Sequence, residues 1–248
     1  MLCSAALLVA SAYDLVEREV PDEIWLLAWP SALFLTGLWL AQDPDALVPA
    51  LISILVSLFL AALIYYTGLM GGADAKALVL IALAFPINGP WALLNGHPFV
   101  PLATFSNALA LSALLALSFL ALNLAWRARS GLPLFEGIEA PLAVKVLVLL
   151  TGLKMRSEDI LSGGRHFFPL EVVDEDGSRR ISLILRVEEL YGRLEGLKKA
   201  LKEGLLPDYI WASPGLPMVV FISAGFLLAI FIGDLVFLAL VALLSVLI

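Results

Sequence analysis

The sequence predicts an all-α polytopic membrane protein with six transmembrane helices and a small α+β cytoplasmic insertion between the fifth and sixth. Of its 248 residues, 61% are hydrophobic and 15% are charged, against roughly 45–50% and about 25% in soluble domains. The apolar residues form long uncharged blocks instead of alternating with polar ones, which is typical of membrane spans. All 15 Lys and Arg residues fall on one side of a six-span arrangement.

The six predicted spans are bounded by polar or turn residues. The fourth begins at about Ala75 and is broken by Pro86, Gly89 and Pro90. The others cover residues 1–16, 24–41, 46–66 and 99–126, and a last segment that starts at Leu216.

The apolar C-terminal stretch needs a break. As one straight helix, residues 216–248 would be about 50 Å long, which exceeds the ~30 Å hydrocarbon core. We therefore expect the helix to break at Gly233-Asp234. The tail after it, residues 235–248, is expected to be re-entrant, tilted or interfacial.

Basic residues predict the orientation. Arg18 follows the first span and Lys76 lies at the edge of the connection after the third, while the other 13 lie between residues 127 and 211. The positive-inside rule makes that side cytoplasmic and puts the N-terminus outside. Residues 1–16 are also compatible with a signal peptide, but no basic residue precedes the apolar run, so a first transmembrane helix is favoured.

The cytoplasmic insertion is expected to be a structural or substrate-docking cap. Residues 167–173 and 181–187 are predicted as two strands, joined by a turn at residues 174–177. Residues 188–203 are predicted as an amphipathic helix, and residues 141–153 as an interfacial or buried helix. The expected regions are 1–126 with the first five spans, 127–215 as the insertion, and 216–248 with the sixth span and the tail.

Several function classes are disfavoured by what the sequence contains. Cys3 is the single cysteine, so an internal disulfide and a Cys-rich zinc site are excluded. His97 and His166 stand apart in the sequence, which disfavours a His-based metal site or a Ser-His triad. The net charge is −7, and no phosphate-loop or dinucleotide motif is present. We expect no metal, no cofactor and no nucleic-acid partner.

Three acidic residues lie in or beside predicted spans, where charges are costly and commonly functional. Asp14 is near the cytoplasmic end of the first span. Asp74 follows Gly71-Gly72-Ala73 at the start of the fourth, on the same side, where a helix N-terminus favours an ionised acid. Asp234 is expected near the outer face in a structural role. The topology thus predicts that Asp14 and Asp74 share one site.

Two carboxylates in one site hold one proton between them. The ionised group can take a proton from water while the protonated one hydrogen-bonds a scissile carbonyl, as in aspartic proteolysis. Three other interpretations stay open. They are interface charges paired with Arg18 or Lys76, a proton-coupled transporter using Asp14 and Asp74 as proton carriers, and a noncatalytic assembly or receptor protein.

At these residues the sequence resembles the type IV prepilin peptidases, and most closely their archaeal preflagellin (prearchaellin) branch. Ala12-Tyr13-Asp14 and residues 18–25 are similar to the first-aspartate region, and Gly71-Gly72-Ala73-Asp74-Ala75-Lys76 is similar to the G-x-G-D motif. Ala73 departs from the glycine of the strict motif and would be strained if the backbone there needed a positive φ. Further similar segments are residues 152–155, 210–214 and 232–234.

The resemblance implies a membrane aspartic endopeptidase that removes a short basic leader, the class III signal peptide, from archaellin or prepilin-like precursors at the cytoplasmic face. It implies Asp14 and Asp74 as catalytic residues. Bacterial relatives add a four-cysteine zinc motif and methylate the new N-terminus. With one cysteine, this chain is not expected to carry that methyltransferase activity. The motif residues expected to support the site are Gly71, Gly72, Ala73 and Lys76.

The expected substrates are membrane-inserted precursors with a basic leader followed by an apolar helix. Four acids beside Asp14 are hypothesised to attract the leader's basic residues, although a solvated loop would show the same composition. Lys76 is expected either to hold Asp74 in its ionised form or to extend to the membrane interface. The four acids are Glu17, Glu19, Asp22 and Glu23.

Overall fold

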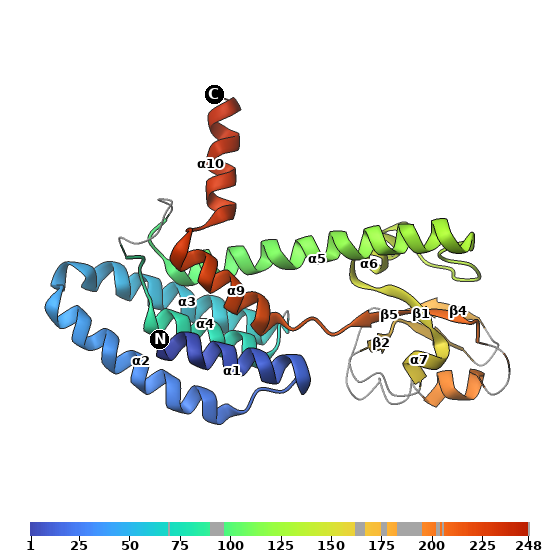
Figure 1. Cartoon of the computed structure of the whole chain (residues 1–248), viewed down its shortest axis with the longest axis horizontal. Coiled ribbons are helices and arrows are strands. Elements are labelled where there is room, and N and C mark those ends of the chain that lie inside the picture. Colours follow the sequence, from blue (N-terminus) through green and yellow to red (C-terminus); the bar gives the residue numbers. More distant parts are fainter. Residues whose placement is uncertain are drawn as a thin grey trace. The chain divides into compact units, whose positions relative to one another are not determined.

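The chain divides into two units in the computed structural model (Figure 1). The first comprises residues 1–113 and 217–248, and the second comprises residues 114–216. One junction lies within helix α5 (Val100–Ser130), between residues 113 and 114, and the other lies between residues 216 and 217. The structure describes residues 1–68, 70–89, 97–161, 167–174, 178–182, 195–201, 204 and 206–247.

The described helices have the length and composition typical of a membrane protein. Three described helical segments are long and apolar enough to cross a bilayer, and α9 with α10, bent by 59°, is a fourth if counted as one span. The apolar helices α1 and α4 have 15 and 13 residues, or about 22 and 20 Å. Six spans are therefore not confirmed. The three long segments are α2 (Asp22–Gln42), Pro44–Thr67, which joins η1 (Pro44–Ala46) to α3 (Leu47–Thr67), and α5. The bent pair is α9 (Met218–Phe231) with α10 (Leu235–Leu247), and the two shorter helices are α1 (Leu2–Val16) and α4 (Gly72–Ala84).

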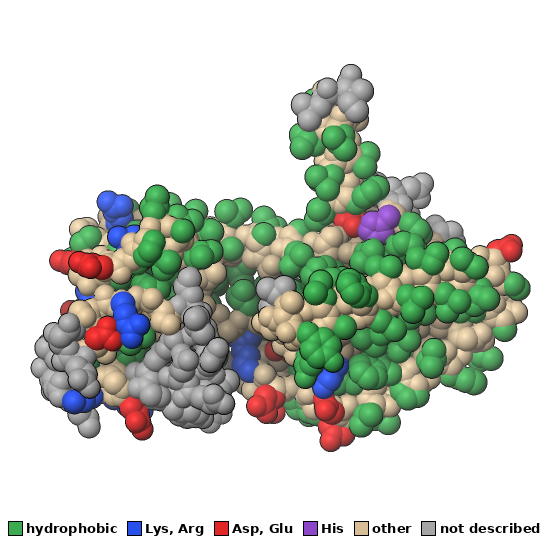
Figure 2. Space-filling model, turned by 180° about the vertical axis from the view of Figure 1, so that it is seen from behind, with side chains coloured by type: hydrophobic (Ala, Val, Ile, Leu, Met, Phe, Trp, Pro, Cys, Tyr) green, Lys and Arg blue, Asp and Glu red, His purple; other side chains and the backbone are tan. Residues whose placement is uncertain are grey.

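The helices pack through small residues and expose large ones. In α2, Ala28, Ala32 and Thr36 recur on one buried face, while Leu26 and Phe34 are more than half exposed. Hydrophobic side chains cover most of the visible face of the first unit in Figure 2. Small residues let helix backbones approach closely where lipid, not water, surrounds the outer face. The large apolar side chains on the outer faces of these helices are therefore suited to contact with lipid.

Helix α4 forms the centre of the first unit and packs against α1, α2, α3 and α9. It ends at Ala84, which confirms the predicted break at Pro86. The last backbone carbonyls of α4 have no donor within the helix. Side-chain hydroxyls of neighbouring helices donate hydrogen bonds at this end instead. The hydroxyl of Thr36 donates to Leu83 O at 2.7 Å, and that of Ser53 donates to Pro86 O at 2.5 Å. A short helix can therefore end among its neighbours with its polar groups satisfied.

The C-terminal stretch breaks where the sequence predicts. Helix α9 ends at Phe231 and α10 begins at Leu235, with Gly233 at φ +118° between them. The buried Asp234 accepts the N–H of Phe237 at 3.0 Å and pairs with Nε2 of His97 at 2.8 Å. His97, isolated in the sequence, thus has a partner, and Asp234 caps α10.

The second unit contains two small antiparallel sheets. A three-stranded sheet has the order β1 (Leu153–Arg156), β5 (Tyr209–Pro214), β2 (Phe167–Pro169). β3 (Glu171–Val173) pairs with β4 (Arg179–Ile181). The remaining described helices are α6 (Leu142–Thr151), α7 (Ser157–Leu161) and a segment at residues 195–201.

The predicted hairpin is partly correct. Its inner strands pair, since Glu171 lies opposite Ile181. However, β2 pairs with β5, which comes much later in the chain, and β1 and β5 were not predicted as strands. The helix expected over residues 141–153 is present as α6. Residues 175–177, 183–194 and 202–203, which include parts of the predicted turn, second strand and amphipathic helix, lie outside the described residues.

A buried carboxylate joins these two sheets. Glu171, fully buried, accepts Lys154 Nζ and Arg179 Nη1 at 3.3 Å each and the Trp211 N–H at 2.8 Å. Burial lowers the pKa of Lys154, and the charge of Glu171 opposes that effect. Lys154 and Trp211 are also register partners in the β1–β5 pair. The two family-like segments of the insertion are therefore structural partners.

We predict that Gly225→Ala destabilises the first unit. A Cβ at Gly225 of α9 would lie 2.5 Å from the carbonyl oxygen of Thr104 and 2.9 Å from the backbone nitrogen of Ala108, both in α5. Rigid backbone on both sides forces the helices apart, at a cost of about 1–3 kcal/mol. Thermal unfolding in detergent measures it.

The matched control is Gly37→Ala in α2, where a Cβ would meet nothing within 4 Å. This exchange should stabilise the protein by up to about 1 kcal/mol through helix propensity. Equal melting temperatures for the two variants would contradict close packing of α9 on α5.

Candidate active site

Three helix ends gather at one end of the first unit. They are the C-terminus of α1 and the N-termini of α4 and α9, and the three helices pack against one another in pairs (Figure 1). Asp14 lies in the last turn of α1 and Asp74 in the first turn of α4. The structure thus brings both predicted aspartates to the same end of the bundle.

Asp14 is oriented by the start of α9. The backbone N–H of Val219 donates to Asp14 Oδ2 at 3.1 Å. Val219 is the second residue of α9, so its N–H has no acceptor within the helix, and the positive end of the helix dipole favours a negative charge there. Sequence analysis did not find this contact, because the residues are 205 positions apart.

A pair of serines fixes α1 against α9 about one turn from this contact. The hydroxyls of Ser11 and Ser223 lie 2.8 Å apart, and Ser223 also bonds Val219 O at 2.8 Å. Both serines are buried. Their only signal in the sequence is a hydroxyl residue within an apolar run, which is too common to identify a contact.

Asp74 is held by its own helix start. Its side chain is 6% exposed, and Oδ2 accepts the N–H of Gly71 at 2.8 Å. A Cβ at Gly71 would lie 3.4 Å from this oxygen, so glycine leaves room for the carboxylate. Ala73 lies within α4 and has no positive φ. The strain considered for alanine at this position is therefore absent.

The negative charge of Asp14 acts on the Asp74 carboxylate. Asp14 is half-buried and Asp74 is buried. Two nearby carboxylates of unequal exposure can share one proton between them. The arrangement can therefore offer one proton donor and one proton acceptor at the same place.

Lys76 does not pair with Asp74. Its ammonium lies 2.5 Å from Asp22 Oδ1, and its backbone carbonyl accepts the indole N–H of Trp29 at 3.3 Å. The expectation that Lys76 holds Asp74 in its ionised form by proximity stays a prediction, since the ion pair that Lys76 makes is with Asp22. Because Lys76 lies two residues after Asp74, it is rotated by roughly 200° around α4 and points to another side. It ties α4 to the start of α2.

The acidic residues beside Asp14 are all exposed. Asp22 is the partner of Lys76. Glu17, Glu19 and Glu23 have no ion pair among the residues that the structure describes. They leave a surface of free negative charge next to the end of α1.

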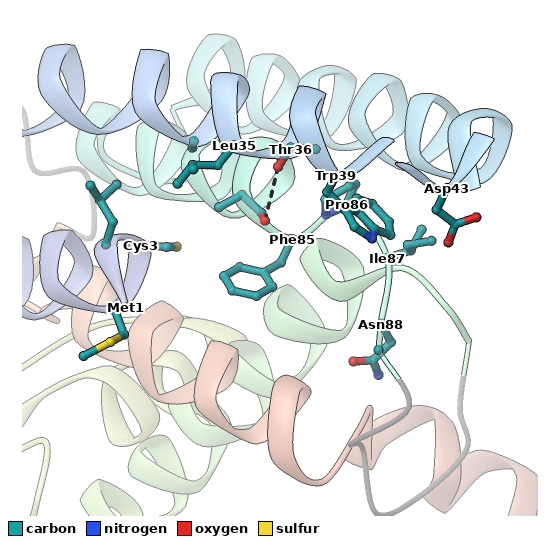
Figure 3. Close-up of a pocket in the computed structure, with 14 residues that line it drawn as sticks. Met1, Cys3, Leu35, Thr36, Trp39, Asp43, Phe85, Pro86, Ile87 and Asn88 are labelled. Carbon is teal, nitrogen blue, oxygen red and sulfur yellow. Dashed lines mark hydrogen bonds between the residues drawn. The ribbon is translucent and has the colours of Figure 1, made fainter. Parts of the chain in front are cut away.

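Neither Asp14 nor Asp74 lines the cavity of about 480 Å³ that Figure 3 shows. It is lined by Met1 and Cys3 at the start of α1, by Thr36 of α2 and by Phe85 after α4. Along α1, Cys3 is about 16 Å from Asp14. In the described part of the chain, no group of three or more His, Cys, Asp or Glu side chains could hold a metal ion.

Two family models match this sequence. The model of the type IV leader peptidase family matches residues 1–125, which contain both aspartates. The chain belongs to the type IV leader peptidase family. The model described as archaeal peptidase A24 C-terminus, type II, matches residues 144–235 of this peptidase. Family membership confirms the resemblance and the expectation of a protease.

The peptidase is also similar along most of its length to two proteins named preflagellin peptidase. It is 24% identical over 240 residues to the preflagellin peptidase of Methanocaldococcus jannaschii, and this similar region covers 92% of this chain and 91% of the relative. It is 23% identical over 246 residues to that of Methanococcus voltae, which covers 92% of each chain.

We predict that Asp22 and Lys76 of the peptidase contribute to stability only through each other. Asp22→Asn and Lys76→Met should each lower the free energy of unfolding by less than about 1 kcal/mol, because both side chains are substantially exposed. The double variant should lose no more than either single one. Thermal unfolding of all four proteins completes the cycle. Fully additive losses would contradict the ion pair.

Proposed function

We propose that this peptidase removes the basic leader peptide from preflagellin or prepilin-like precursors by aspartic proteolysis at the cytoplasmic face of the cell membrane. The observation that carries the proposal is the convergence of Asp14 and Asp74 at the end of α1 and the start of α4. The names of the two relatives support preflagellin as the substrate class.

In the proposed mechanism, one aspartate is ionised and the other carries a proton. The ionised carboxylate takes a proton from water as the water oxygen attacks the scissile carbonyl carbon. The protonated carboxyl donates to the carbonyl oxygen and stabilises the developing oxyanion. When the C–N bond breaks, the proton taken from water passes to the leaving nitrogen. The backbone N–H groups of Val219 and Gly71 keep the two carboxylates in place.

The proposed topology has six spans and an external N-terminus. It rests on the position of the basic residues, since Arg18, Lys76 and residues 127–211 share one side. The sixth span is α9, and α10 forms the apolar tail after the break. On this topology both aspartates lie at the cytoplasmic boundary, where a precursor's basic leader meets its apolar helix. The bilayer holds that helix, and the exposed acids beside Asp14 attract the leader.

A proton-coupled transporter is the alternative use of two such aspartates. Membership of a peptidase family disfavours it. A purified protein that cleaves a precursor in detergent, without added metal or nucleotide, supports the protease. Proton-driven flux in liposomes without any cleavage would support the transporter.

We predict that Asp14→Asn and Asp74→Asn each reduce cleavage by at least about 10²–10⁴-fold, which is the contribution expected of a general acid or base. Asparagine keeps an oxygen that can accept the Val219 or Gly71 N–H, so folding should be preserved. Cleavage of a purified precursor followed by gel electrophoresis measures the effect, and melting temperatures report folding.

The matched control is Asp45→Asn, which removes an exposed acid in the connection before α3. Its activity should stay within about threefold of the unmodified enzyme, since surface changes are usually small. Cleavage at the normal rate by either Asp14 or Asp74 variant would refute the proposed pair.

We also predict that reversing the charge of Glu17, Glu19, Asp22 and Glu23 together slows processing of a precursor with a basic leader. The loss should be larger at low ionic strength, because salt screens exposed charges. A precursor whose leader lysines are replaced by glutamine should show little difference between the two enzymes. Unchanged processing at both ionic strengths would remove the acids from leader binding.

A further inference from the structure

Arg18 has hydrogen-bond donors that the protein leaves unused. Its Nε and Nη1 atoms are buried and have no partner in the described part of the chain. A buried donor without an acceptor costs free energy, and more when the group is charged. Such groups are uncommon in folded proteins and call for an explanation. An arginine on the protein surface would normally extend into solvent and satisfy these atoms with water.

The backbone at Arg18 is also unusual. Arg18 has φ +60° and is the single non-glycine residue with a positive φ among those described. Its N–H bonds Tyr13 O at 3.2 Å, which closes the end of α1 in a geometry that usually has glycine. A side chain in this conformation is strained. Unpaired donors and strain at one residue both indicate a function for its side chain.

Arg18 is close to the candidate active site. It lies four residues after Asp14, and its positive charge acts on that carboxylate. Neither buried nitrogen bonds Asp14, so the guanidinium is near the aspartate without being neutralised by direct contact. Both nitrogens are closed to solvent in this structure, so a bound peptide reaches them when the side chain turns toward it.

We infer that Arg18 is a substrate-binding residue whose guanidinium donates hydrogen bonds to backbone carbonyl oxygens of the precursor segment that enters beside Asp14. This inference rests on the proposed function and identifies a contact within that site. The exposed acids Glu17, Glu19 and Glu23 surround Arg18 in the sequence. They would repel an acidic side chain, so neutral carbonyl oxygens are the favoured acceptors. An extended peptide presents such oxygens on both of its edges.

The inference is tested by direct binding, with Asp74→Asn enzyme to prevent turnover. The probe is an amidated, fluorescent peptide of Lys, Gly, Ala and Leu with a basic leader and an apolar segment. Its acceptors are all backbone carbonyls. Adding Arg18→Asn should raise the Kd about 10- to 100-fold, and Arg18→Lys should give an intermediate loss. Asparagine tolerates a positive φ, so the variant removes the donors and keeps the turn.

Arg127→Asn, an exposed arginine at the end of α5, is the matched control and should change the Kd less than threefold. The melting temperature of Arg18→Asn should equal or exceed that of the parent, because strain and unpaired donors are removed. Equal Kd values for Arg18→Asn and its parent would overturn the inference, as would full binding by Arg18→Lys, a lowered melting temperature, or no binding at all. Cleavage of the same peptide by unmodified enzyme decides the proposed function separately.

Discussion

Free backbone N–H groups at two helix starts determine where the candidate carboxylates lie. Asp14 is held by the start of α9, and Asp74 by the residue that caps α4. Neither aspartate depends on a basic side chain for its position. The position of Asp14 therefore depends on how α1 packs on α9, and the Ser11–Ser223 contact maintains that packing, while the close approach at Gly225 keeps α9 on α5. A change in the packing of α1 on α9 would separate Asp14 from the Val219 N–H without touching either acid.

Packing of this kind is favoured by small residues and by hydroxyls. Alanine and serine bring the helices together, and hydroxyl groups satisfy the carbonyls at the end of α4. Because lipid supplies no hydrogen bonds, each end of a short internal helix needs such partners. At one end of α4 they are neighbouring hydroxyls, and at the other the Asp74 carboxylate accepts an N–H. The need to pair backbone polar groups where lipid supplies no hydrogen bonds therefore explains both the C-terminal end of α4 and the N-terminal end that carries Asp74.

The sequence predicts whatever depends on local pattern. Long apolar blocks predict the helices, Gly71-Gly72-Ala73-Asp74 predicts an acid at a helix start, and Gly233-Asp234 predicts a break. Contacts between distant residues have no such signal. The pairing of β1 with β5, the bond from Val219 to Asp14 and the Lys76–Asp22 pair all join segments more than 50 positions apart. The number of spans is not confirmed in the same way, because an apolar block does not reveal whether its helix reaches spanning length.

The shortness of α1 has a consequence for the surrounding lipid. One face of α1 is apolar and exposed, with Leu8, Val9, Leu15 and Val16 among its outward residues. A helix of about 22 Å is several ångströms shorter than the hydrocarbon layer beside it. On the proposed topology, the leaflet must thin locally to match this helix, at a modest free-energy cost. Headgroups and hydration would then reach the level of Asp14, so that a peptide bond could meet water without leaving the membrane.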